Sequence, residues 1–286
     1  MPLLYYWRDD NYRHDLDYGV GYHLNQANPL LHKVELGDSV WAFTRALNGV
    51  YALGAELVVS AKTGNPPGYR YGQYRVWGDL QRSRYFAVNG QLKITPLIRS
   101  LHIAAGGDVL GRAFQGRAAV RRITEADHTS LTAYVQRLSL EARARLLPEE
   151  QLEALLVSGD EVAVKRLLRD EPSGLAEARR LYLVAQAAAT TRDRRLVVEL
   201  RDLYAGACQL CGWAPRQSYG TDLCEAHHVR WLSRGGPDEI ANLLLVCLNH
   251  HRAIHRLDAP FDYRIGGFVF GMDTERLRFS EHELVA

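Results

Sequence analysis

The chain has 286 residues, of which 47% are hydrophobic, and its formal net charge is +2. This length suits two domains, and no apolar run approaches the roughly 20 residues that a membrane span requires. The N-terminus meets acidic residues at once and lacks the basic start and apolar core of a signal peptide. We therefore expect a cytoplasmic protein.

Residues 1–122 have the pattern of a β-rich domain. The segments 39–46, 49–62 and 71–88 are rich in Val, Tyr, Trp and Phe, and Gly, Asn and Pro separate them. Several such strands in a short span predict a small barrel or a curved sheet. Because helices follow, the expected fold class is α+β.

The net charge conceals a basic block at residues 61–122, which hold 11 lysines and arginines against two aspartates. Tyr, Trp and Phe are interleaved with them, and basic residues beside stacking aromatics favour nucleic-acid binding. Each aromatic alone is better explained as core. The candidate DNA contacts in this block are Arg70, Arg75, Arg82 and Arg84.

Residues 123–191 are predicted to form a helical connector, because Ala, Leu, Glu and Arg dominate and the strand pattern stops. Thr124 opens one expected helix, and Pro148 opens another with acids in its first turn. A connector, a dimer interface and a second DNA-binding surface are all compatible with this region. Residues 192–286 are expected to form the third segment.

All four cysteines lie in the last segment. Cys208 with Cys211, and Cys247 with His250, have the spacing that lets a turn present two ligands to one tetrahedral ion. In a reducing compartment this pattern indicates a metal site, here a structural zinc, instead of disulfides. A module this short buries little core, so the metal would supply much of its folding energy. Cys224 fits neither pair and is expected to be a buried, inert thiol.

A second set of candidate ligands lies in the same stretch of sequence. His227 and His228 are adjacent on an expected strand, so their side chains point to opposite faces, and one can bind a metal while the other faces a water. His251 and His255 are four residues apart, on one face of a helix. The intervening loop contains Gly-Gly-Pro and returns Asn242 to the same place.

The motifs C-x-x-C, E-A-H-H-V, G-G-P-D-x-x-x-N and C-x-x-H-H-x-x-x-H together resemble the HNH endonuclease family, the ββα-metal nucleases, over residues 200–256. The resemblance implies that residues 192–286 form the nuclease domain, with a β-hairpin, a loop and a helix around one catalytic metal. It also implies hydrolysis of DNA phosphodiester bonds to 5′-phosphate and 3′-hydroxyl ends.

The same resemblance implies residue roles. His228 would be the general base, His227 and His251 metal ligands, and His255 a further ligand or a phosphate contact. Asn242 would fix the loop and orient the base. Many relatives carry a cysteine where this chain has His250, which leaves open whether His250 or His251 serves the zinc.

The catalytic ion is expected to be Mg²⁺, Mn²⁺, Ni²⁺ or Zn²⁺, and histidine ligation suits the transition metals better than Mg²⁺. Three arginines flank the site and could clamp phosphates, although solvated surface charge explains them equally well. These candidates are Arg230, Arg234 and Arg252.

The N-terminal sequence at residues 21–45 resembles PUA-like domains of the EVE type, chiefly in Leu36-Gly37-Asp38-Ser39-Val40-Trp41. The resemblance implies a small barrel that can receive an extruded modified base. The candidates to stack on such a base are Trp7, Tyr22, Trp41 and Trp77. A reader of this kind joined to an HNH module resembles a modification-dependent restriction endonuclease.

Two alternatives stay open. One is an HNH nuclease with ordinary sequence specificity, of the homing or conventional restriction type, and the other is a zinc-stabilised DNA-binding protein that does not cleave. The expected partner is double-stranded DNA, modified under the first hypothesis, although RNA is not excluded. HNH sites cut one strand each, so duplex cleavage would take a homodimer or two successive nicks.

Overall fold

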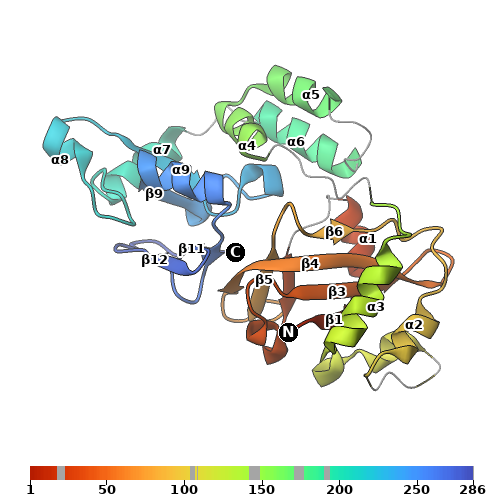
Figure 1. The fold of residues 1–286 in the computed structure, drawn as a ribbon. Helices are drawn as coiled ribbons and strands as arrows, with labels where there is room; N and C mark the ends of the chain where they lie inside the picture. Colours follow the sequence, from red (N-terminus) through yellow and green to blue (C-terminus); the bar gives the residue numbers. More distant parts are fainter. Residues whose placement is uncertain are drawn as a thin grey trace. The chain divides into compact units, whose positions relative to one another are not determined.

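The computed structural model describes most of the chain, namely residues 1–17, 23–103, 107, 109–141, 149–170, 177–189 and 194–285 (Figure 1). The chain divides into an N-terminal unit and a C-terminal unit. The N-terminal unit comprises Met1–Lys62, Arg70–Arg145 and Ser173–Ala178. The C-terminal unit comprises Thr63–Tyr69, Leu146–Pro172 and Arg179–Ala286. None of the helices in the described ranges has the length and hydropathy needed to cross a membrane.

In the described part of the N-terminal unit, seven strands form one sheet that curls into a half-barrel (Figure 1). The strand order is β2-β5-β4-β3-β1-β7, with β6 paired to β4. β1 runs parallel to β3 and antiparallel to β7. The strands are β1 (Leu3–Tyr6), β2 (His23–Gln26), β3 (Ser39–Arg45), β4 (Tyr51–Gly64), β5 (Tyr74–Gly78), β6 (Arg84–Tyr85) and β7 (Val120–Arg122).

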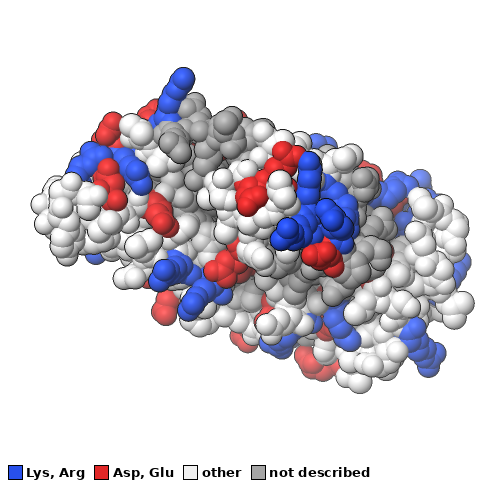
Figure 2. All heavy atoms as spheres, turned by 90° about the horizontal axis from the view of Figure 1, so that it is seen from above, with Lys and Arg blue, Asp and Glu red and all other residues white. Residues whose placement is uncertain are grey.

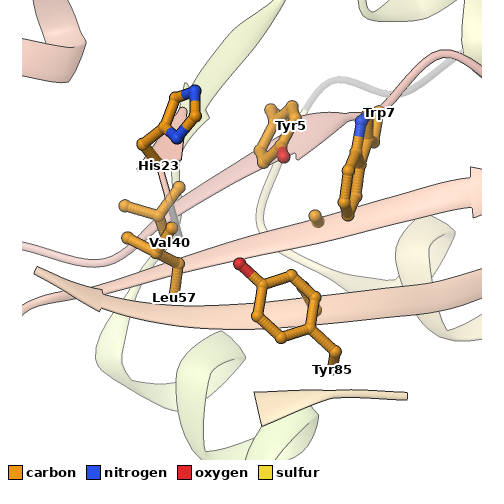
Figure 3. Close-up of a pocket in the computed structure, with 8 residues that line it drawn as sticks. Tyr5, Trp7, His23, Val40, Leu57 and Tyr85 are labelled. Atoms are coloured by element: carbon orange, nitrogen blue, oxygen red, sulfur yellow. The ribbon is translucent and has the colours of Figure 1, made fainter. Parts of the chain in front are cut away.

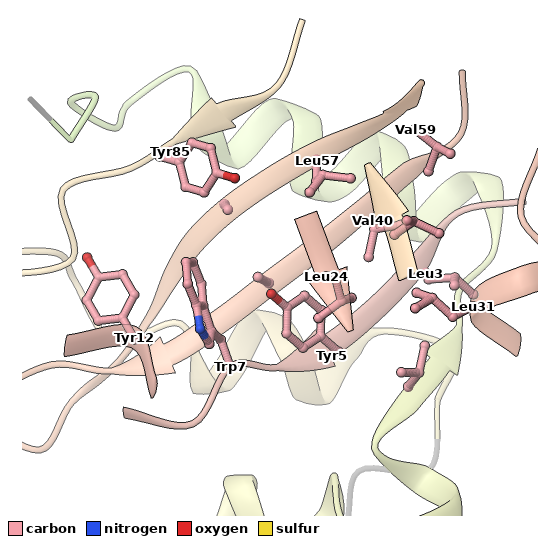
Figure 4. Close-up of a cluster of buried hydrophobic side chains, with 14 of the residues drawn as sticks. Leu3, Tyr5, Trp7, Tyr12, Leu24, Leu31, Val40, Leu57, Val59 and Tyr85 are labelled. Carbon is pink, nitrogen blue, oxygen red and sulfur yellow. The ribbon is translucent and has the colours of Figure 1, made fainter. Parts of the chain in front are cut away.

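The sheet is buried on both faces, and the side chains of β3 pack alternately into the hydrophobic clusters on the two faces. Val40 and Ala42 belong to one hydrophobic cluster, together with residues of α1 (Asp9–Asp17) and β2 (Figure 4). Trp41 and Phe43 alternate with them and belong to a second cluster. Because successive strand residues point to opposite faces, a nearly continuous apolar strand is required here.

Helices cover the second cluster. α2 (Thr95–Ser100) contributes Ile98, and α3 (Glu125–Val135) contributes Leu131 and Val135. α3 begins with a capping box in which Thr124 accepts from the backbone of Asp127 and the Asp127 carboxylate accepts from the backbone of Thr124. The helix expected at Thr124 is therefore present, and it packs on the N-terminal sheet.

The remaining helices before the cysteines lie in the C-terminal unit, apart from the first two residues of α6. They are α4 (Glu149–Ser158), α5 (Glu161–Asp170), α6 (Glu177–Ala189) and α7 (Arg194–Leu203). Leu152 and Leu156 of α4 are buried, as are Val164 of α5 and Leu183 of α6. α4 and α5 form a hairpin through Gly159, whose φ of 71° is the left-handed conformation common at helix ends. Pro148, at which the sequence predicts that a helix opens, lies outside the described residues.

After α7 and the short α8 (Pro215–Tyr219), two antiparallel strands lead into one helix: β8 (Cys224–His228), β9 (Leu243–Cys247) and α9 (Leu248–Leu257). All five residues of β9 are buried, and they form a core with Leu200, Tyr204 and Phe268. A small sheet follows, made of β10 (Phe261–Asp262), β11 (Gly267–Phe270) and β12 (Asp273–Arg276). Mixed α+β architecture is thereby confirmed.

Candidate metal centre

Three histidines from β8 and α9 converge on one point. His227 is the fourth residue of β8, while His251 and His255 lie one turn apart on α9. The His227 ring centroid lies 5.4 Å from that of His251 and 5.0 Å from that of His255. The Nε2 atoms of His251 and His255 are 3.2 Å apart. One ligand atom from each of the three lies within 4.8 Å of the others, which is a spacing that a single metal ion can bridge.

The hydrogen bonding of these rings fits a bound cation. His227 is 1% exposed, and neither of its ring nitrogens has a hydrogen-bond partner among the described residues. A buried polar atom without a partner costs free energy, and metal coordination would remove that penalty. Burial, followed by the charges of His255 and His251, lowers the pKa of His227 well below its usual range. Burial and His251 lower the pKa of His255 to about 4. Both rings are therefore neutral near pH 7, which is the form that binds metals.

A glutamate fixes the second ligand ring. Nδ1 of His251 lies 2.7 Å from Oε2 of Glu225, so Nε2 is the atom that faces the cluster. Partners of this kind orient metal-binding histidines and raise their basicity. The sequence offered a signal for Glu225, because it lies two residues before His227 and therefore on the same face of β8.

His228 faces away from the three-histidine cluster. Its side chain is almost fully buried, with Nε2 2.9 Å from Oδ1 of Asp238 and Nδ1 3.8 Å from Oε1 of Glu153. Asp238 belongs to the loop between β8 and β9, and Glu153 belongs to α4. The alternation expected for the adjacent histidines is therefore observed. The two acidic neighbours were not anticipated.

Asn242 closes the loop that follows β8. Its side-chain oxygen accepts from the backbone N–H of Arg230 at 2.8 Å, and its amide donates to the carbonyls of Arg230 and Pro237 at 2.9 and 2.8 Å. The turn needs glycine: Gly235 has φ of 80°, and a Cβ on Gly236 would lie 1.8 Å from the Arg230 carbonyl oxygen. Asn242 thus fixes the loop directly, and its contacts begin two residues after His228.

The cysteine pairs form a second candidate metal site. Nδ1 of His250 lies 3.6 Å from Sγ of Cys208 and 3.2 Å from Sγ of Cys247, and the sulfurs of Cys211 and Cys247 are 4.0 Å apart. Ligands at zinc–sulfur distance in a tetrahedron are about 3.8 Å apart, so the donor set and its spacing fit zinc. Nε2 of His250 is held at 2.8 Å by Glu275 of β12.

The structure therefore groups His250 with the cysteines and His251 with His227 and His255. Cys224 lies outside both groups. It is buried, and burial together with the charges of the neighbouring thiols raises the pKa of Cys224 to about 12. Its position outside both groups, and not its pKa, separates Cys224 from the candidate ligands.

The arginines near the site differ in exposure and in their ion pairs. Arg230 and Arg252 are exposed. Arg234 instead lies 2.7 Å from Asp258 and 3.9 Å from Glu149, with its guanidinium 4.3 Å from the centre of the Trp231 ring. Its guanidinium therefore already has carboxylate partners within the unit.

Four arginines were candidates in the N-terminal unit. Arg70 and Arg82 are exposed. Arg84 is ion-paired with the buried Glu56, and Arg75 donates to Asn25 at 2.7 Å with its guanidinium over Trp77. The first two can reach a ligand as they stand, whereas the last two are held by the fold. On the face of the molecule in Figure 2, basic and acidic side chains are interspersed.

The structure does not gather the candidate base-stacking residues in one pocket. Trp7 lines a small cavity with Tyr5, His23 and Tyr85 (Figure 3). The volume of this cavity is about 10 Å³. Trp41 is fully buried on the opposite face of the sheet, where its Nε1 donates to His128 at 3.0 Å. The Trp77 ring lies 5.2 Å from the ring of His23, tilted by 46°, and does not line the cavity. Tyr22 lies outside the described residues.

Comparison with known proteins bears on the C-terminal unit. Residues 208–257 match the family model for the HNH endonuclease, which confirms the resemblance drawn from the motifs. No curated protein matches the chain.

Among solved structures, the chain is similar to one described as the Type IV phosphorothioation-dependent restriction endonuclease ScoMcrA, at 12% identity and a TM-score of 0.22. That alignment covers 81% of this chain and 41% of the other. The chain thus spans about two fifths of the other protein, and a TM-score this low does not indicate a common fold.

Proposed function

We propose that this chain, which carries an HNH endonuclease domain at residues 208–257, is a metal-dependent DNA endonuclease. The observation that carries the proposal is the cluster of His227, His251 and His255. Its ligand atoms lie within 4.8 Å of one another, and both ring nitrogens of the buried His227 have no hydrogen-bond partner among the described residues. The next strand residue, His228, lies on the other face of β8 and is the candidate base.

His228 is the proposed general base. Asp238 accepts a hydrogen bond from Nε2–H in the tautomer that leaves Nδ1 unprotonated. Nδ1 would then take a proton from water, and the hydroxide oxygen would form a bond to phosphorus. The bond from phosphorus to the 3′ oxygen breaks, that oxygen takes a proton from water, and the products carry 5′-phosphate and 3′-hydroxyl ends.

The proposed ligands of the catalytic ion are His251 and His255 through Nε2, and His227. A divalent cation bound there would supply electrostatic stabilisation of the negative charge that develops on the phosphate. Neutral imidazoles favour Mn²⁺, Ni²⁺ or Zn²⁺ over Mg²⁺. Glu225 keeps His251 in the orientation that this ligation needs.

The second site, made by Cys208, Cys211, Cys247 and His250, is proposed to hold a structural zinc. Its ligands come from the turn before α8 and from the junction of β9 with α9. An ion there would join the two ends of the nuclease module, and Glu275 would hold the histidine ligand. The site has four protein ligands and therefore leaves no open position for substrate.

Duplex DNA is the proposed substrate. Arg230 and Arg252 are exposed beside the nuclease centre, and Arg70 and Arg82 are exposed in the N-terminal unit. Side chains of this kind contact phosphates and position a protein on DNA without reading its sequence. Cleavage of both strands is proposed to need two copies of the chain or two successive nicks.

We further propose that the N-terminal unit reads a modified base, so that the chain acts as a modification-dependent restriction enzyme. Support comes from the curled sheet, its aromatic cavity at Trp7, and the basic block at residues 61–122. A cavity of about 10 Å³ holds a single water at most. A flipped base would therefore enter only after Tyr5, Trp7 and Tyr85 move apart.

A cleavage assay tests both the nuclease activity and the reading of a modified base. Two matched plasmids, one unmodified and one carrying methylated or hydroxymethylated bases, are incubated with the protein and Mn²⁺, Mg²⁺ or Ni²⁺. Cleavage of the modified plasmid alone, lost in His228→Ala, is the expected result. Equal cleavage of both plasmids would retain the nuclease and remove the modified-base reader, and the ordinary HNH specificity would take its place.

A further inference from the structure

Glu153 is an acidic residue of α4, outside the residues that match the nuclease family. It is 2% exposed. Its Oε1 accepts from the backbone N–H of Leu232 at 3.0 Å, and its Oε2 accepts from that of Ser233 at 2.7 Å. These residues begin the 3₁₀ turn Leu232–Arg234 of the loop that leaves His228. One carboxylate therefore satisfies two N–H groups of that loop.

The same carboxylate also lies against the proposed base. Oε1 of Glu153 is 3.8 Å from Nδ1 of His228, while Asp238 is 2.9 Å from Nε2 on the other edge of the ring. The imidazole is thus flanked by a carboxylate at each nitrogen. Because the ring is buried, these neighbours restrict the rotation of the side chain.

A second helix, α6, binds the same turn by donating a hydrogen bond to a backbone carbonyl group of the turn. Nη2 of Arg179, on α6, donates to the backbone oxygen of Ser233 at 2.8 Å and to Oε1 of Glu149 at 2.9 Å. The turn is therefore bonded to α4 through its N–H groups and to α6 through a C=O group. The geometry of the loop after His228 depends on helices that precede the nuclease module in sequence.

Burying Glu153 carries a penalty. Burial raises the pKa of its carboxyl group, while the hydrogen bond from Ser233 and the charge of His228 act in the opposite direction. An apolar residue of similar size would pack at this position of α4 without that penalty. It would leave the N–H groups of Leu232 and Ser233 unsatisfied and would not contact the edge of the His228 ring.

We propose that Glu153 is a positioning residue of the nuclease centre, which holds the His228 ring and the loop behind it in one orientation. The inference rests on the proposed function of His228 as the base. It extends the active unit beyond the HNH match to include α4 and α6, so the nuclease module needs this helical region for its full rate.

The test uses the full chain with Glu153→Gln and Glu153→Ala, and with Glu150→Gln as the matched control, because Glu150 is an exposed glutamate on the same helix. The first measurement is independent of cleavage. Long-range ¹H–¹⁵N spectra of histidine-labelled protein report the ring nitrogens of His228, which are assigned from their loss in His228→Ala. Glu153→Gln is expected to shift these resonances, and Glu150→Gln is expected to leave them in place.

The second measurement is the rate of DNA cleavage per folded protein. Glu153→Gln is expected to lower kcat about 10- to 100-fold without a matching rise in KM, because the DNA contacts are unchanged. A purely structural role would lower the melting temperature alone. The near-isosteric Gln variant keeps the test valid if Glu153→Ala does not fold.

Unchanged His228 resonances in Glu153→Gln would overturn the proposal, as would a kcat equal to that of Glu150→Gln. If the wild-type chain cleaves no DNA, the proposed nuclease function fails. The spectra still decide whether Glu153 orients the His228 ring, so the two failures are distinguishable.

Discussion

Glu225 and His251 form a contact of 2.7 Å between Oε2 and Nδ1 that joins β8 to α9. Because the carboxylate takes Nδ1, the opposite nitrogen Nε2 is presented to His255, 3.2 Å away. A residue outside the proposed ligand set thus sets the orientation of a proposed ligand.

Replacing Glu225 with Gln is therefore expected to weaken metal binding at the three-histidine cluster about 10- to 100-fold. Titration calorimetry with Mn²⁺ or Zn²⁺, on protein whose cysteine site is already loaded, measures the affinity. Glu239→Gln is the control, since Glu239 is exposed. Equal affinities in the two variants would contradict the role given to Glu225.

Asp238→Asn should act on the chemical step. An amide can donate to Nε2 of His228 and favour the tautomer with the proton on Nδ1, where the base must be unprotonated. We expect kcat to fall about 100-fold with KM nearly unchanged, within the range that general-base catalysis contributes. Single-turnover cleavage measures this. A rise in KM at constant kcat would show instead that Asp238 serves DNA binding.

Cys211→Ser is expected to remove one equivalent of bound zinc and to lower the melting temperature of the C-terminal unit, because four ligands join the ends of the module. Cys224→Ala is the matched control and should keep the zinc, since Cys224 lies outside the cluster. Zinc release measured with a colorimetric chelator, alongside thermal unfolding, compares them. Loss of zinc in the Cys224 variant would refute this ligand assignment.

Arg234 and Arg252 should behave differently on truncation to alanine. Arg234→Ala leaves Asp258 without this cation and leaves Glu149 with Arg179 alone, and it is expected to destabilise the protein by about 2 kcal/mol. Arg252→Ala, at an exposed position, is expected to weaken DNA binding and reduce its salt dependence while stability is kept. Urea unfolding and salt-dependent binding separate the two, and weaker DNA binding by a fully stable Arg234→Ala would contradict the assignment.

The ionisation of Asp15 makes the stability of the N-terminal unit depend on pH. Burial raises its pKa to about 6, against the hydrogen bond from Trp7. The folded pKa is above the unfolded value. The contribution of Asp15 to the free energy of unfolding is therefore greatest below about pH 4 and is lost as the pH rises through about 6. Asp15→Asn should flatten this slope and add about 2 kcal/mol at pH 8.

Urea unfolding at several pH values, followed by tryptophan fluorescence, measures the Asp15 effect. The exposed Asp10, whose pKa is lowered through Asn11 and Arg8 against a burial effect, supplies the control Asp10→Asn, which should gain nothing at pH 8. An unchanged slope in Asp15→Asn would show that Asp15 is ionised freely in the fold.

Much of the candidate site was predictable because its geometry is local. Spacing of two intervening residues places Cys208 beside Cys211, and spacing of four places His251 and His255 on one face of α9. Alternation on β8 separated His227 from His228. Residues contributed from a distance could not be found this way: Glu153 lies 75 positions before His228, and Glu275 reaches His250 from β12.

The fold was predictable in its elements more than in its assembly. The segments 39–46 and 49–62 correspond to β3 and β4, whereas 71–88 contains two strands, β5 and β6, separated by a turn at Asp79. The apolar pattern could not show that Trp7 and Trp41 face opposite sides of the curled sheet. Both faces are buried, so the middle of β3, Val40–Phe43, carries no polar residue that marks either face.

The most direct test of the nuclease assignment is cleavage by protein stripped of metal with a chelator, reloaded with zinc at the cysteine site, and then supplied with Mn²⁺, Ni²⁺ or Mg²⁺. Wild-type protein is expected to cut DNA only after the second metal is added, and His228→Ala is expected to bind that metal without cutting. Cleavage that persists without the second metal, or at the wild-type rate in His228→Ala, would contradict the account.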